Sequence, residues 1–297
     1  MEQPTIHGIL CLNKPEDITS FWCCSLIRKL LQTKKVGHGG TLDPMATGVL
    51  PILIGNATKA MDILPIQDKK YVASFRFGYT SNTQDVWGNV TATRKPIPTK
   101  EQLESILSHY TGEILQVPPM MSALQKDGVR LYDLARQGIE IEREPRKITI
   151  YSCNLLSYDE KTGEGKLDCH VSKGTYIRSL CDDIGKELGC GAIMTALTRT
   201  MAAGYTLNQC ISLADAKEMS SEELATHILP TESAFSVYPI LEVTPAQGVR
   251  FKNGGALALN RLPRAISETV RVYGDNHFLG LGKPEADSLQ ILKLFPD

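Results

Sequence analysis

The 297-residue sequence lacks several features that would place it in a familiar class. No apolar run approaches the ~18 residues that a membrane-spanning helix needs. The first residues, MEQPTIHGILCLNKPED, have no basic segment before a long apolar run, so they do not predict a signal peptide. The eight cysteines are too sparse for a disulfide scaffold, and no two are spaced as C-x-x-C. We therefore expect a cytoplasmic protein with reduced, mostly buried thiols.

Metal-ligand patterns and an excess of basic charge are also missing. The six histidines are dispersed without an H-E-x-x-H spacing, so we expect neither a metal nor another cofactor. With 32 basic and 33 acidic residues the net charge is −1, whereas proteins that bind polyanions often carry a basic excess. Basic residues do cluster locally, at 28–35 and at 143–147. Any affinity for nucleic acid would depend on such clusters and would show a modest salt dependence.

The hydrophobic fraction of 42% predicts a globular protein, and several segments have clear periodicity. Residues 71–77 read as a strand, and residues 146–173 as two antiparallel strands with a turn near Gly163. Helices are predicted from Thr19 or Ser20, with Phe21 on the apolar face, and over about 176–188. Three weaker elements are also expected: a strand at 8–12, a helix opened by a Thr99–Gln102 capping box and continuing through His109, and a short helix at 131–136.

The pattern changes at about Val237. From there, short strand-like segments are broken by glycine every eight to ten residues, which is typical of a small β domain. About sixty residues lie near the lower limit for independent stability, so this region is expected to dock on the rest. We predict two domains, 1–236 and 237–297.

One glycine-rich stretch, GHGGTLDPMATGVLPILIG at 37–55, contains a single acid, Asp43. Asp-Pro pairs are common in turns, so Asp43-Pro44 could be only a turn. However, glycine permits close approach of a ligand, and the apolar run that follows would hold the loop on a rigid core. A carboxylate ionised at neutral pH could act as a nucleophile or a base without an activating partner.

Two further stretches are candidates for function. Tyr71 begins the strand 71–77, where a tyrosine is most often a core or edge residue. In SKGTYIRSL, Arg178 falls on the first turn of a predicted helix, where a cation opposes the helix dipole. Arg178 should therefore point away or have an anionic partner, and Asp43 is a candidate for that partner.

Five motifs, in order, carry a resemblance to a known family: GILCLNKP, GHGGTLDPMATGVLPILIGNATK, KKYVASFRFGYTSNTQDVWG, PPMMSALQKDGVRLYDLAR and SKGTYIRSL. Together they resemble the TruB family of tRNA pseudouridine synthases over the chain to about residue 210. The region after Val237, with KNGGALAL and HFLGLG, more weakly resembles a PUA-type RNA-binding domain. The resemblance implies a mixed, mainly antiparallel sheet flanked by helices, that is, an α/β (α+β) catalytic domain followed by a small β-rich domain.

The implied activity is isomerisation of uridine 55 in the T-arm of tRNA to pseudouridine. Asp43 matches the family's catalytic aspartate, and Arg178 matches the arginine that pairs with it. The target base would be flipped out of its stack. His38 matches the histidine that fills the vacated space, Tyr71 the tyrosine that stacks on the base, and Leu197 an apolar residue that lines the base pocket.

Other matching residues are expected to shape the pocket rather than to react: Lys14, Pro15, Gly40, Thr41 and Leu42. The reaction is neither redox nor hydrolytic, so no cofactor or metal is implied. The resemblance implies tRNA as partner, no membrane and no guide RNA, and we expect a monomer. Three departures from the family pattern, Gly39, Met121 and Thr198, put RNA affinity in more question than catalysis.

Three alternatives stay open at this level. A guide-RNA-dependent pseudouridylase would share the fold, but such relatives tend to carry extensions and basic tails, and this sequence ends LQILKLFPD. A tRNA-folding chaperone could coexist with isomerisation, since both use the same contacts. Without the resemblance, an Asp-dependent hydrolase would be the fallback, and it would need a second acid or base.

Overall fold

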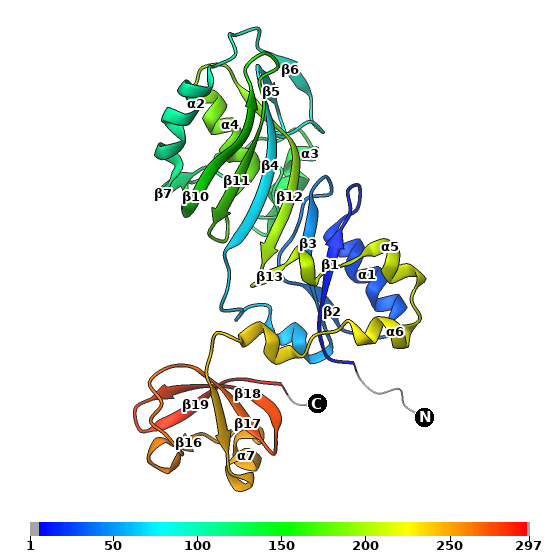
Figure 1. Ribbon diagram of the computed structural model, residues 1–297, viewed down its shortest axis with the longest axis vertical. Helices are drawn as coiled ribbons and strands as arrows, with labels where there is room; N and C mark the ends of the chain where they lie inside the picture. Colours follow the sequence, from blue (N-terminus) through cyan, green and yellow to red (C-terminus); the bar gives the residue numbers. More distant parts are fainter. Residues whose placement is uncertain (1–5, 296–297) are drawn as a thin grey trace. The chain divides into compact units, whose positions relative to one another are not determined.

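A computed structural model describes residues 6–295, which form two compact units (Figure 1). Unit 1 contains the chain up to Pro44, then Val49–Ile66, and everything from Ala202. Unit 2 contains Met45–Gly48 and Gln67–Met201. The glycine-rich stretch is therefore divided between them, since it leaves unit 1 after Pro44 and returns to it at Val49.

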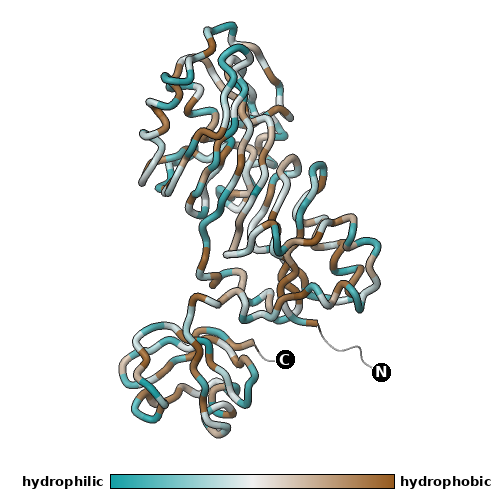
Figure 2. Tube along the Cα trace, in the orientation of Figure 1, coloured by the Kyte–Doolittle hydropathy of each residue, from teal (hydrophilic) through white to brown (hydrophobic). Residues whose placement is uncertain are grey.

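The first part of unit 1 is a small sheet with helices. Its strands are ordered β14-β1-β3, and β2 pairs antiparallel with β3. Their bounds are β1 Gly8–Lys14, β2 Val36–His38, β3 Thr47–Ile54 and β14 Ile211–Ser212. The helices are α1 Ser20–Leu30, α5 Leu213–Glu218 and α6 Ser221–Thr226. Strands β1 and β3 consist mostly of hydrophobic residues, as the colours of Figure 2 show. They are accordingly buried along almost their whole length.

The remainder of unit 1 is the predicted C-terminal β region. Five strands pair in the order β15-β17-β18-β19-β16, and helix α7 (Pro245–Lys252) begins with a capping box between Thr244 and Gln247. The strand bounds are β15 Ile240–Val243, β16 Leu257–Ala258, β17 Val270–Gly274, β18 His277–Glu285 and β19 Ser288–Leu294. The prediction of a β-rich C-terminal region is confirmed, whereas helix α7 within it was not predicted.

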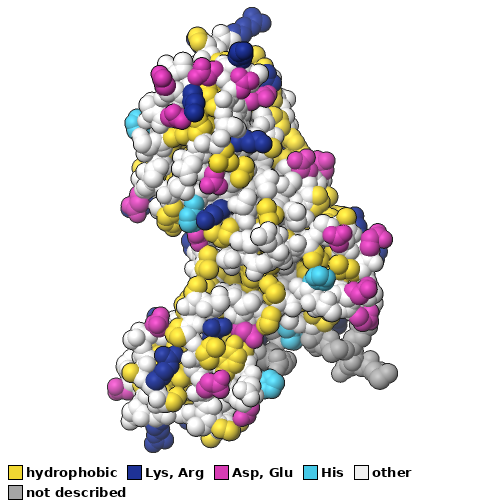
Figure 3. Space-filling view, in the orientation of Figure 1, with side chains coloured by type: hydrophobic (Ala, Val, Ile, Leu, Met, Phe, Trp, Pro, Cys, Tyr) yellow, Lys and Arg dark blue, Asp and Glu magenta, His cyan; other side chains and the backbone are white. Residues whose placement is uncertain are grey.

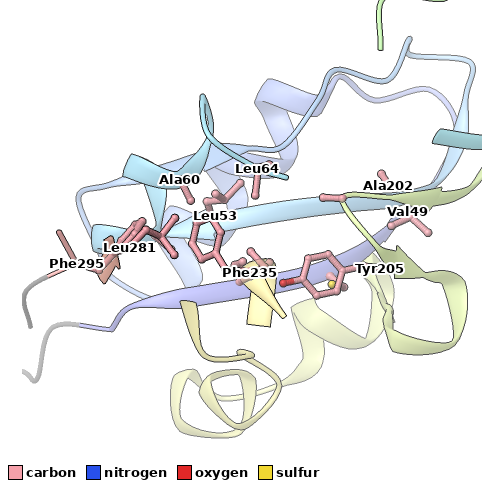
Figure 4. Packing of buried hydrophobic residues seen from close by; sticks show 14 residues of the cluster. Val49, Leu53, Ala60, Leu64, Ala202, Tyr205, Phe235, Leu281 and Phe295 are labelled. Atoms are coloured by element: carbon pink, nitrogen blue, oxygen red, sulfur yellow. The ribbon is translucent and has the colours of Figure 1, made fainter. Parts of the chain in front are cut away.

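A shared core holds this β region on the first part of unit 1 (Figure 4). Phe235 is fully buried, and its ring centroid lies 5.5 Å from that of Phe295. Leu281 of β18 and Leu53 of β3 belong to the same cluster. Docking adds apolar burial that a segment of this size lacks by itself.

Unit 2 is built on a sheet ordered β12-β4-β11-β10-β7, with α2 and α4 lying against it (Figure 1). The pairs β4–β11, β10–β11 and β7–β10 are all antiparallel, whereas Thr47 and Gly48, at the start of β3, pair parallel with β12. The bounds are β4 Lys69–Phe77, β7 Gly112–Gln116, β10 Arg146–Asp159, β11 Glu164–Val171, β12 Ala192–Ala202, α2 Lys100–Leu107, α3 Leu131–Arg136 and α4 Ile177–Glu187. The mixed, mainly antiparallel α+β architecture is confirmed.

Five short strands complete the chain: β5 Tyr79–Ser81, β6 Val90–Ala92, β8 Gln125–Lys126, β9 Val129–Arg130 and β13 Tyr205–Thr206. Two expectations were wrong in detail. The side chain of Phe21 is 70% exposed, because α1 buries the stripe of Ser20, Cys24 and Ile27 instead. Helix α2 ends at Leu107 and continues only as a single 3₁₀ turn.

The surface carries charges of both signs. Acidic and basic side chains are interspersed on the face shown in Figure 3, in line with a net charge of −1. Within residues 6–295, no helix is long and apolar enough to cross a membrane.

Candidate active site

Asp43 lies in the loop that joins β2 to β3 in unit 1. The two strands pair antiparallel, with His38 opposite Ile52, so the loop is closed at its base. One residue further on, the amide of Gly39 donates to the carbonyl of Pro51 at 2.8 Å. Asp43 itself is half-buried and therefore still reachable from solvent.

Both chain neighbours of Asp43 are held by side chains from other segments. The hydroxyl of Ser20, on the first turn of α1, accepts from the amide of Leu42 at 2.8 Å and donates to its carbonyl at 3.0 Å. The ammonium of Lys14, at the end of β1, donates to the carbonyl of Pro44 at 3.0 Å. The backbone on each side of Asp43 is thus fixed to a rigid element, which a reacting group requires.

Lys14 is fully buried and its ammonium binds three carbonyl oxygens. Besides Pro44, it donates to Pro15 and Ile18, each at 2.8 Å. A charge without solvent is tolerated only when it is well satisfied, and three carbonyls match its three protons. Lys14 therefore ties the turn after β1 to the loop that carries Asp43.

The glycines of this loop have different roles. Gly40 has a φ of +132°, a conformation that side chains rarely adopt, so the turn beside Thr41 needs a glycine. A Cβ on Gly39 would meet only ordinary contacts of 3.5–3.6 Å, with Leu64, Leu53 and Pro51. Gly39 could therefore carry a small side chain, so its departure from the family pattern is not required by the fold.

The other three predicted residues lie in unit 2. Tyr71, on β4, is 7% exposed and pairs in register with Cys169 of β11. Leu197, also 7% exposed, is on β12, the strand next to β4. Arg178, on the first turn of α4, is 4% exposed. Asp43 and Arg178 belong to different units, so the contact expected between them stays a prediction.

Arg178 does have an anionic partner within its own unit. One guanidinium nitrogen donates to the carbonyl of Thr83 at 3.0 Å and lies 3.7 Å from the carboxylate of Asp85. The other donates to the carbonyl of Met121 at 2.9 Å. Asp85 is 6% exposed and also accepts from the amide of Trp87 at 2.9 Å. These contacts hold the arginine at the start of α4 despite the unfavourable helix dipole.

Sequence reasoning missed Asp85 although the segment TSNTQDVWG was singled out. Its neighbour Gln84 donates to the carboxylate of Asp182 and accepts from the hydroxyl of Ser179, both at 2.8 Å. The signal was an acid directly after a pair of polar residues in a turn. Nothing in the local pattern showed that this turn lies against α4.

Basic groups gather just before Tyr71. Burial, and then the buried guanidinium of Arg199, lowers the pKa of Lys69 to about 8, while Asp68 acts in the opposite direction and Lys173 in the same one. Among residues 6–295, no three His, Cys, Asp or Glu side chains gather as metal ligands. Unit 1 thus offers a carboxylate in a fixed loop, and unit 2 offers, separately, the basic groups of Lys69, Lys173 and Arg199.

Two protein-family models match adjoining parts of the chain. Residues 28–177 match the N-terminal domain of the TruB family pseudouridylate synthases, and residues 178–236 match the tRNA pseudouridylate synthase B C-terminal domain. The chain belongs to the TruB family. It is therefore a pseudouridine synthase, an isomerase.

Individual relatives agree with the assignment to the TruB family. The chain is 43% identical to tRNA pseudouridine synthase B of Clostridium kluyveri, over 98% of this chain and 100% of that protein. It is 41% identical to the protein of the same name from Clostridium tetani, over 97% and 99%. A chain in the crystal structure of a Cbf5–Nop10–Gar1 complex is 25% identical, with a TM-score of 0.73 over 97% of this chain and 85% of that one.

For this TruB family member, replacing Asp85 is expected to destabilise unit 2. An Asp85→Asn change removes one buried carboxylate from beside the guanidinium of Arg178, and breaking a buried ion pair costs about 3–5 kcal/mol. The 3.7 Å between Arg178 and Asp85 is long for an ion pair, and Asn keeps an acceptor for the amide of Trp87. We therefore expect the free energy of unfolding, measured in urea, to fall by about 3 kcal/mol.

The matched control for Asp85→Asn is Glu164→Gln. Glu164 lies at the same 3.7 Å from Arg76, but those side chains are 58% and 40% exposed. Its loss should change the free energy of unfolding by no more than about 0.5 kcal/mol. Equal losses in the two variants would contradict the importance of burial at Arg178.

Proposed function

We propose that this protein isomerises uridine 55 in the T-arm of tRNA to pseudouridine. The observation that carries the proposal is Asp43, held between two fixed backbone positions in a loop with the GHGGTLDP sequence. The names of the curated relatives support tRNA as the substrate, since they cover nearly the whole chain at 41% and 43% identity.

In the proposed reaction the base is flipped out, its bond to C1′ through N1 breaks, the base turns, and a new bond forms from C1′ to C5. The proton displaced from C5 leaves to solvent and N1, freed from C1′, takes up a proton, so atoms and charge balance without a cofactor. Asp43 starts the exchange by attack on C6 of the uracil, by attack on C1′ of the ribose, or by proton abstraction that gives a glycal.

The remaining site residues would act on binding. Tyr71 would stack on the flipped uracil, an interaction worth roughly 1–3 kcal/mol. Leu197 would line the base pocket, and His38 would occupy the space that the nucleotide leaves. Arg178 would pair with Asp43. Its hydrogen bonds to two carbonyls support this role, because they fix the guanidinium before substrate arrives.

The partners and location follow from the same family. We propose that the protein acts without a guide RNA, as a monomer in the cytoplasm, and that residues 237–297 contribute a PUA-like RNA-binding domain. The far higher identity to the tRNA pseudouridine synthase B proteins than to the Cbf5 complex supports action without a guide. All eight cysteines are free thiols, as expected in a reducing compartment.

The test uses an unmodified tRNA transcript incubated with the protein, followed by carbodiimide labelling of pseudouridine and primer extension. We expect a single new stop, at position 55. A transcript with cytidine at that position should give none. Stops elsewhere, or none, would refute the assigned position, and tritium release from C5-labelled uridine would show separately whether any isomerisation occurs.

The depressed pKa of Lys69 predicts that tRNA affinity depends on pH. The protonated ammonium binds phosphate, and the charged fraction falls as pH rises through the pKa of about 8. Affinity should therefore drop roughly two- to fivefold between one pH unit below and one above that value, about the effect of one screened ion pair.

In Lys69→Met this dependence of tRNA affinity on pH should vanish. In Lys70→Met, which alters the exposed neighbour, it should remain. Filter binding with labelled tRNA measures it, and an unchanged slope in Lys69→Met would rule this explanation out.

A further inference from the structure

Unit 2 also contains a cavity beside strand β4. On β4, Tyr71, Phe75 and Phe77 alternate with Ser74 and Arg76, so the two sets face opposite sides of the sheet. Cys169 pairs with Tyr71 and therefore faces the same side of the sheet. It also interacts electrostatically with Cys181 of α4, so α4 lies on that side. Ser74 and Arg76 line a cavity of ≈ 530 Å³ on the other side.

The cavity combines apolar walls with a few polar groups. Its size lies within the range of about 300–1,000 Å³ that is typical of small-molecule sites. Val86 and Val90 form one wall and Ile193 of β12 another, and both valines remain exposed. An apolar cavity with few convergent polar side chains is the usual form of a binding site.

Besides Ser74, Ser157, Lys166 and Thr195, the polar groups include an arginine, a tyrosine and a glutamate that lie close together. The guanidinium of Arg76 lies 4.7 Å over the ring centroid of Tyr79 and 3.7 Å from the carboxylate of Glu164. That separation is too long for a hydrogen bond, and the buried Nε of Arg76 has no hydrogen-bond partner. A flat cation with unused donors thus lies beside a carboxylate with unused acceptors.

We propose that this cavity binds a nucleobase, guanine in preference to the others. Unstacked bases bind proteins by stacking on aromatic rings and guanidinium planes and by hydrogen bonds along their edges. Guanine presents the acceptors O6 and N7 beside the donors N1–H and N2–H₂. Arg76 can donate to O6 and N7, and Glu164 can accept from N1 and N2. Uracil can engage each group through only one atom at a time.

The base would lie between the valine wall and Ile193, next to Tyr79. This site is independent of Asp43, since it needs no isomerisation. Within unit 2 the cavity lies near the contacts of Arg178, because Val86 follows Asp85 and the amide of Val86 donates to the carbonyl of Met194 at 3.1 Å. The base can come from a bound RNA, which rests on the proposed function, or from a free guanine nucleotide.

The first arm of the test titrates ¹⁵N-labelled protein with GMP or UMP. We expect saturable shifts confined to cavity residues, with a Kd of about 1 mM for GMP, and binding of UMP at least about fivefold weaker. Arg76→Gln should abolish the shifts and Glu164→Gln should remove the preference for GMP. Arg94→Gln, an exposed arginine outside the cavity, should change neither. Absence of saturable shifts at the cavity, or shifts that persist in Arg76→Gln, overturns the proposal.

The second arm measures tRNA affinity of wild type, Arg76→Gln and Arg94→Gln. A loss confined to Arg76→Gln, together with GMP binding, identifies an RNA base as the occupant. Unchanged tRNA affinity together with GMP binding identifies a free guanine nucleotide. A tRNA effect without GMP binding shows only a charge contact and overturns the proposal. Neither arm depends on uridine conversion, so failure of the proposed function is distinguished from failure of this site.

Discussion

Asp43→Asn should abolish pseudouridine formation while leaving the protein folded and able to bind tRNA. The change removes the nucleophilic or basic carboxylate but keeps its size and an acceptor oxygen. Losses on removal of a catalytic side chain of this kind reach about 10⁴-fold or more in kcat. We expect at least that loss in tritium release from a transcript labelled at C5 of uridine.

The loop geometry makes this variant interpretable. Leu42 and Pro44 are held through backbone atoms by Ser20 and Lys14, and these contacts remain in the variant. Asp62→Asn, an exposed acid in the same unit, is the matched control and should react at the wild-type rate. If Asp43→Asn kept a substantial fraction of the wild-type kcat, the catalytic role would have to be assigned to another group.

The same variant separates isomerisation from tRNA folding. Folding assistance uses the contacts that bind and open the T-arm, and these should survive in Asp43→Asn. An assay in which misfolded tRNA regains aminoacylation after incubation would then respond equally to wild type and variant. Loss of both activities together would show that any folding effect follows from the chemistry.

Local signals predicted the secondary structure well where one segment determines it. The Thr99–Gln102 capping box forms as expected, with both reciprocal hydrogen bonds. The short helix at 131–136 and the hairpin turn at Gly163 also lie where the pattern placed them. Caps and turns involve residues three or four apart, so the sequence alone carries their geometry.

Contacts between distant segments could not be predicted in this way. Phe21 fits the predicted apolar stripe of α1 by spacing but is exposed, whereas Cys24 and Ile27 of the same stripe are buried as predicted. Arg178 was expected to need an anion, yet Asp85 was not named, because 93 positions separate them in the sequence. The helix-dipole argument predicted that Arg178 needs an anionic partner, but only the fold shows that Asp85 lies beside it.

The position of Asp43 illustrates both cases. The apolar run after it correctly predicted that its loop leads into a buried strand. The resemblance included Lys14 as a residue that shapes the pocket, without a mechanism. The structure supplies one, because a single buried ammonium connects three carbonyls from two segments.

Lys14→Met should therefore reduce both stability and turnover. Methionine fills a similar volume without donors, so the carbonyls of Pro15, Ile18 and Pro44 would all lose a charged hydrogen-bond donor in a site closed to water. Hydrogen bonds to charged groups are each worth about 1.5–3 kcal/mol, and partial relaxation of the loop should limit the total loss to roughly 3–5 kcal/mol. Urea unfolding monitored by circular dichroism measures it.

The loss should extend to catalysis, because the residue after Asp43 is released. We expect kcat to fall by at least about 10²-fold, the usual effect of displacing a reacting group by about an ångström, with KM for tRNA little changed. Lys29→Met, an exposed lysine of α1, should alter neither stability nor kcat. A Lys14→Met protein that is destabilised yet turns over normally below its unfolding transition would show that Lys14 stabilises β1 and its turn without positioning Asp43.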